Sequence, residues 1–140
     1  MPSWSEVERD APEFARRVRT LFQARKHKTM ATLRADGSPR ISGIETQFGD
    51  ELTFGSMPRS RKGADLARDP RVALHSPSVD PPEGDDAGWL GEAKVSGREL
   101  RTDDGYRVDI AEVALTYLGG GQLVIESWHP GRGLEKVARD

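Results

Sequence analysis

The sequence contains no cysteine, so the chain cannot form a disulfide, a thiolate metal site or a thiol nucleophile. It has no apolar run near the ~20 residues that span a bilayer. The first residues also lack the basic, apolar and small-residue regions of a secretory signal peptide. We therefore expect a cytoplasmic protein that does not enter the membrane.

Neither sign of charge dominates, since 21 Lys and Arg face 23 Asp and Glu and the formal net charge is −2 at pH 7. Binding to a nucleic-acid backbone usually requires a strong basic excess, so no nucleic-acid partner is expected. The three histidines lack metal-site spacing, and no Gly-x-Ser-x-Gly motif is present. Neither a metal site nor a hydrolase triad is therefore expected.

A chain of 140 residues has the usual size of one domain, and we expect a single domain over residues 1–140. The pairs Ser5/Glu8 and Asp10/Glu13 have the spacing of capping boxes, which predicts a helix start. An amphipathic helix is expected from Ala11 to about Arg25, with one apolar face formed by Phe14, Val18, Leu21 and Phe22. A second, short helix is expected over Ser60–Asp69.

Most of the remaining chain consists of short β-prone runs separated by turn residues. Asp36-Gly37 predicts a hairpin because glycine readily takes the positive φ of a type I′ turn. The Pro- and Gly-rich segment from Ser76 to Gly91 predicts a long loop. Many antiparallel strands with two or three short helices favour a mainly β, closed or nearly closed barrel. The expected strands are Thr29–Arg34, Arg40–Phe48, Glu51–Ser56, Arg71–His75, Glu92–Arg101, Arg107–Leu118 and Gln122–His129.

The segment from Phe54 to Gly63 combines a strand end, a turn and a helix start that carries a hydroxyl and two cations. Ser60 is a possible N-cap, and Arg61 and Lys62 follow it. A helix amino terminus offers unpaired N–H groups and a positive dipole end, which suit an anion such as phosphate. The pattern alone is compatible with a phosphate site or with a solvated basic turn.

Residues 14 to 76 resemble the pyridoxamine 5′-phosphate oxidase-like, FMN-binding split β-barrel family. The most specific part is Ser60-Arg61-Lys62, followed by Leu66 and by Asp69-Pro70-Arg71-Val72. The carboxyl-terminal strands match only in pattern. The resemblance implies an antiparallel split β-barrel and a homodimer with cofactor sites at the interface between subunits.

The resemblance also implies which residues hold the cofactor. By position, Arg61 and Lys62 would hold the FMN phosphate together with Ser60. Ser56 and Met57 would lie near the phosphate or the ribityl chain, and Ser42, Gly43 and Ile44 would line the ring edge. Trp128, Trp89 and Arg132 are candidates for ring stacking or substrate contact, although a tryptophan also serves as a core residue.

The implied function is an FMN-dependent oxidoreductase that acts on a small molecule, with no separate acid–base pair and no identified substrate. The alternatives are a reductase that uses the deazaflavin factor 420, a non-catalytic module that binds flavin or haem, and a structural domain with a vestigial pocket. The chain is shorter than the enzyme that names the family and lacks its substrate-phosphate residues near the end. Oxidation of pyridoxamine phosphate is therefore not expected.

Overall fold

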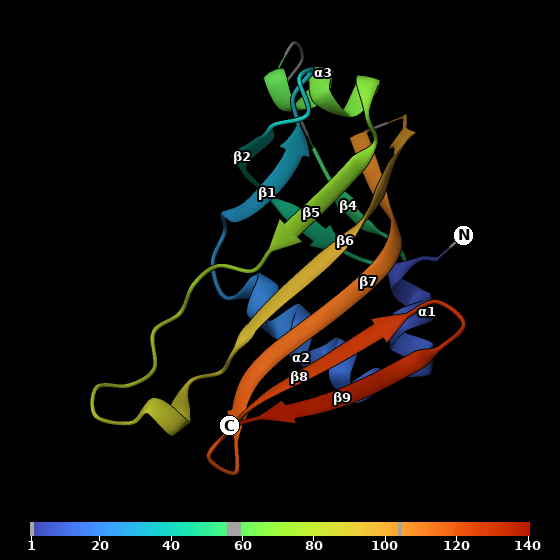
Figure 1. Ribbon diagram of the computed structural model, residues 1–140. Coiled ribbons are helices and arrows are strands. Elements are labelled where there is room, and N and C mark those ends of the chain that lie inside the picture. Colours follow the sequence, from blue (N-terminus) through green and yellow to red (C-terminus); the bar gives the residue numbers. More distant parts are fainter. Residues whose placement is uncertain (1, 56–59, 104) are drawn as a thin grey trace.

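The computed structural model describes residues 2–55, 60–103 and 105–140 and shows a curled antiparallel sheet with helices at two places (Figure 1). The order in the sheet is β2-β1-β5-β6-β7-β4-β3, and β8 and β9 continue outward from β7. The helices are α1 (Trp4–Asp10), α2 (Pro12–Gln23) and α3 (Arg61–Arg68). The strands are β1 (Lys28–Leu33), β2 (Pro39–Ile44), β3 (Thr46–Phe48), β4 (Leu52–Phe54), β5 (Arg71–His75), β6 (Glu92–Thr102), β7 (Gly105–Gly119), β8 (Gln122–His129) and β9 (Gly133–Arg139).

The two ends of the seven-strand path meet at one residue. Strand β2 ends at Ile44 and β3 begins at Thr46, so only Glu45 joins the strands that stand at opposite ends of the path. The sheet must therefore curl until its ends approach, which produces a barrel. The expectation of a mainly β, antiparallel split barrel with two or three short helices is confirmed, and the described residues form three α-helices.

Besides shifts of one or two residues at strand ends, three elements differ from the sequence-based expectation. The strand expected over Arg40–Phe48 is interrupted at Glu45, where the sheet turns its corner. The helix expected from Ala11 is preceded by α1, whose N-cap is Ser3 rather than Ser5. Strand β9 was not predicted because its residues, mostly exposed, show no alternation of buried and exposed side chains, and only pairing with β8 makes them a strand.

The hydrophobic core lies between the sheet and the pair α1 and α2, which lie behind its lower half in Figure 1. Helix α2 turns the apolar face predicted from the sequence toward the sheet. The fully buried large side chains include Trp4, Phe22, Met30, Leu52, Leu115 and Trp128. None of the described helices is both long enough and apolar enough to cross a membrane.

A register shift between Ser96 and Gly97 bends the two longest strands, β6 and β7. A Cβ atom at Gly97 would lie 2.1 Å from the carbonyl oxygen of Asp109, so glycine is required at this close approach. Such a bulge increases the local twist of the strands. The added twist helps β6 and β7 to pair with β5 on one side and with β4 on the other as the sheet curls.

Candidate functional site

Helix α3 covers the end of the sheet opposite to α1 and α2 (Figure 1) and begins as its sequence predicts. Ser60 is its N-cap, with extended backbone, and its hydroxyl accepts a hydrogen bond of 3.1 Å from the amide of Gly63. Arg61 and Lys62 form the first turn. The cations thus lie where the helix dipole is positive, an arrangement that an anionic ligand would stabilise.

Lys62 connects the start of α3 to strand β2. Its Nζ donates a hydrogen bond of 3.1 Å to the carbonyl oxygen of Gly43. Strand β2 stands at one end of the sheet path. Gly43 is exposed, and a Cβ atom built on it would meet only the carbonyl oxygen of Lys28, 4.0 Å away. The structure therefore brings together two segments that the resemblance assigned to the cofactor separately.

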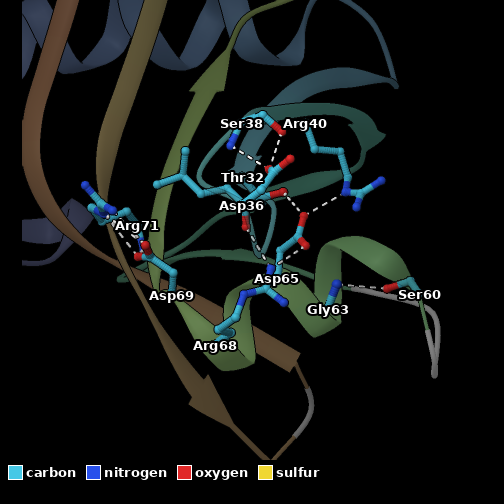
Figure 2. A network of polar contacts seen from close by, with 11 residues as sticks. Thr32, Asp36, Ser38, Arg40, Ser60, Gly63, Asp65, Arg68, Asp69 and Arg71 are labelled. Carbon is cyan, nitrogen blue, oxygen red and sulfur yellow. Dashed lines mark hydrogen bonds and ion pairs between the residues drawn. The ribbon is translucent and has the colours of Figure 1, made fainter.

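A buried carboxylate fixes α3 against the first hairpin, as Figure 2 shows. Asp65 accepts hydrogen bonds from Thr32 Oγ1 at 2.8 Å, Arg40 Nε at 2.7 Å and Arg68 Nη2 at 2.9 Å. The Arg40 hydrogen bond is the largest cause of a lowered pKa, and together the three donors outweigh burial and hold the pKa of Asp65 at about 2. The carboxylate is therefore ionised at neutral pH and binds β1, β2 and α3 together.

An open hollow of about 410 Å³ lies beside this cluster. Four arginines and two aspartates contribute to its lining, so positive charge is in excess. Asp36 is already engaged, since its Oδ1 accepts from both the amide and the hydroxyl of Ser38. Arg61 forms no hydrogen bond or ion pair with the described residues. The lining residues are Arg34, Ala35, Asp36, Arg40, Arg61, Ala64, Asp65 and Arg68.

Sequence reasoning did not identify Arg40 as a site residue. Its register partner on β1 is Thr32, and both side chains reach Asp65 on the next helix. The sequence did indicate that Arg40 and Thr32 are neighbours, because a hairpin at Asp36-Gly37 places Arg40 opposite Thr32. The missing information was that α3 packs over this hairpin.

The residues predicted at the ring edge lie on two faces of β2. Ser42 is half-buried and Ile44 is buried in the core, whereas Gly43 between them is exposed. Because alternate side chains point to opposite faces of a strand, the side chains of Ser42 and Ile44 lie on the side away from Gly43's exposed face. Ile44 can offer only backbone contacts there. Ser56 and Met57 lie outside the described residues.

Trp128, a candidate for ring stacking or for the core, lies in the core in this structure. Its side chain is fully buried, and its Nε1 donates a hydrogen bond of 3.1 Å to Asp10. The ring is therefore not available to a ligand in this chain. Trp89 lines a separate hollow of about 230 Å³ between α2 and the end of β7. Arg132 is exposed and pairs with Glu135 at 3.7 Å.

Within residues 2–55, 60–103 and 105–140, no group of three or more His, Asp and Glu side chains could hold a metal ion. The side chains at the start of α3 and around the hollow are instead mainly cationic. A capped helix start and an arginine-rich hollow lie at α3, and Lys62 of this helix reaches the carbonyl oxygen of the exposed edge-strand glycine Gly43. Such an arrangement suits the phosphate group of a ligand.

The fold and this cationic corner define a split β-barrel whose helix α3 starts with a serine, an arginine and a lysine beside the edge strand β2. The sequence model of the family described as pyridoxamine 5′-phosphate oxidase matches residues 14–116. The chain belongs to this family. A comparison with curated protein sequences gave no match.

Solved structures share the fold at low sequence identity. A pyridoxamine 5′-phosphate oxidase-related, FMN-binding protein from Nostoc punctiforme is 11% identical, with 92% of this chain and 94% of that chain covered and a TM-score of 0.63. PhzG from Burkholderia lata, in complex with tetrahydrophenazine-1-carboxylic acid, is 13% identical, with coverages of 91% and 86% and a TM-score of 0.61. A heme binding protein from Mycobacterium smegmatis is 17% identical, with coverages of 99% and 59% and a TM-score of 0.56.

Proposed function

We propose that this chain binds FMN, with the phosphate at the start of α3, and that it is an FMN-dependent oxidoreductase acting on a small molecule. The observation that carries the proposal is the Lys62 hydrogen bond to the Gly43 carbonyl. It joins a phosphate-type helix start to an exposed strand surface that can receive a flat ring. Family membership and the FMN-binding relative from Nostoc punctiforme support the same cofactor.

The residues at the α3 end fit a phosphate group in charge and in chemistry. A phosphate monoester carries about −1.5 to −2 charges at pH 7 and offers several acceptor oxygens. Arg61 provides a planar set of donors, and Lys62 provides a mobile ammonium. Arg40 and Arg68 already donate hydrogen bonds to Asp65. Their main contribution to the hollow is therefore positive charge, and fewer of their N–H groups are available to a ligand.

FMN, when bound, supplies the hydride or electron transfer. The chain's own residues then have three tasks. Arg61 and Lys62 bind the phosphate, and the Asp65 cluster holds α3 in place against β1 and β2. Because Gly43 has no side chain, a flat ring can lie directly against the backbone of β2 at this position. This division needs no separate acid–base pair, because a positioned ring and substrate can react directly.

The face of the sheet that carries Gly43 also supports the proposed homodimer. Apolar side chains are exposed on it, with Ile41 exposed to 76% and Val137 to 54%. Helices α1 and α2 pack on the other face. A second copy of the chain would bury these side chains and would also enclose a ring lying on the same face.

The first experiment identifies the cofactor. The protein is purified, its visible spectrum is recorded, and any released cofactor is identified by mass. Two flavin absorption bands and the mass of FMN are expected. A deazaflavin band, a Soret band or a colourless protein that does not take up added FMN would instead support factor 420, haem or a vestigial pocket.

The second experiment tests the phosphate site with a matched pair of double variants. Arg61→Ala/Lys62→Ala is expected to weaken FMN binding at least about 30-fold, because hydrogen bonds to charged groups contribute about 1.5–3 kcal/mol each. Arg25→Ala/Lys26→Ala removes the same two residue types from the exposed bend between α2 and β1 and should change the Kd less than twofold. Equal FMN affinity in both variants, or equal affinity of the unaltered chain for FMN and riboflavin, would refute the phosphate assignment.

A further inference from the structure

A row of residues crosses the exposed face of the sheet from the proposed cofactor site. Gly43 on β2 is in register with Thr29 on β1, Thr29 with His75 on β5, and His75 with Lys94 on β6. On β5, Val72 and Leu74 are buried, so His75 lies on the opposite face from the core. The row therefore runs along the same face as the exposed surface of Gly43.

Both ring nitrogens of His75 face hydrogen-bond acceptors. Nδ1 lies 2.6 Å from the carbonyl oxygen of Ser76, and Nε2 lies 3.1 Å from Oε2 of Glu92. A neutral imidazole donates from only one nitrogen, whereas the imidazolium donates from both. With Glu92 ionised, the protonated form of His75 is the one that satisfies both contacts.

The group around His75 keeps an excess of positive charge. The other carboxylate oxygen of Glu92, Oε1, lies 3.5 Å from Nζ of Lys94. One carboxylate thus balances two cations when His75 is protonated. The side chains of His75 and Glu92 are each about a third exposed, so a molecule lying on the sheet can reach them.

The part of the row from Gly43 to His75 is about as long as the ring system of a flavin. Neighbouring strands lie about 4.8 Å apart, so His75 is roughly 10 Å across the sheet from Gly43. Gly43 has no side chain, and Thr29 has a short one. A ring whose phosphate tail is held at Lys62 can therefore lie over these two residues and end beside His75.

Resting on the proposed function, we propose that His75 holds a positive charge at the far end of the flavin ring and favours the reduced cofactor over the oxidised one. A flavin gains electron density in its ring on reduction, so a nearby cation stabilises the reduced form more. The contacts to Ser76 and Glu92 orient the imidazole, and the imidazolium is the form that satisfies both of them. His75 thus tunes the cofactor and does not hold its tail.

The test measures the midpoint potential of FMN bound to the full chain, by equilibration with a dye of known potential at pH 7. His75→Gln should weaken the preference for reduced over oxidised FMN about tenfold, which for a two-electron couple is a shift of about 30 mV to more negative potential. His75→Arg keeps the charge and should restore most of the potential. The Kd for oxidised FMN should stay within about threefold in both variants.

A second histidine on the same face provides the matched control. His129 on β8 pairs with Glu112 through Nε2 at 2.7 Å, and three steps along the sheet separate β8 from β5. His129→Gln should leave the potential unchanged. FMN binding with the same potential in His75→Gln as in the unaltered chain would overturn this inference alone. Absence of FMN binding to the unaltered chain would overturn the proposed function and this inference with it.

Discussion

Replacing Asp65 by Asn removes the negative charge that holds α3 against the first hairpin and keeps the size of the side chain. The pKa of Asp65 is about 2 instead of the usual 3.8, chiefly because of the Arg40 hydrogen bond. One pKa unit corresponds to about 1.4 kcal/mol, so the ionised carboxylate contributes roughly 2.5 kcal/mol to the free energy of unfolding. Asp65→Asn should therefore lose about 2–3 kcal/mol at pH 7.

The pH dependence of this loss has a definite sign. A carboxyl group with a lowered pKa in the folded state stabilises the fold above the pKa of the unfolded chain, and this contribution disappears as pH falls through the folded value. The difference between the original chain and Asp65→Asn should be complete above about pH 5. It should shrink from there toward pH 2.

Urea denaturation followed by circular dichroism at several pH values from 7 to 2.5 measures this difference. Comparing the two chains at each pH cancels the contributions of other acidic groups to the pH dependence. One of these is Asp69, whose pKa is also lowered to about 2, mainly by the hydrogen bond from Arg71. A loss below about 0.5 kcal/mol at pH 7, or a difference that does not change with pH, would refute the reasoning that the Asp65 charge stabilises α3.

Two further variants test how the rest of the barrel is built. Gly91→Ala should lower the free energy of unfolding by at least about 2 kcal/mol, because Gly91 has a φ of +100° and a Cβ atom there would lie 2.3 Å from the Thr116 carbonyl oxygen; a urea midpoint equal to that of the original chain would contradict this. Trp128→Phe should cost about 1–3 kcal/mol, because it leaves a space in the core and removes the hydrogen bond to Asp10. A thermal midpoint unchanged by Trp128→Phe would show that the indole is not part of the core.

The elements that depend on near neighbours in the chain were predictable. Ser60 caps α3 through an amide three residues away, and the first hairpin closes around Asp36-Gly37. The apolar face of α2 also follows from the spacing of its own residues. These signals are local, because a cap, a turn and a helix face involve side chains within a few positions of one another.

The sequence by itself therefore determined the barrel class, the start of α3 and the cationic pair Arg61-Lys62. Only the tertiary structure decided which distant residues join them. Arg40 reaches Asp65 across 25 positions, Lys62 reaches Gly43 across 19, and Trp128 reaches Asp10 across 118. Strand register and helix packing fix these contacts. A one-residue slip in register reverses the faces of a strand, so local pattern alone could not place Arg40 beside Asp65 or Trp128 in the core.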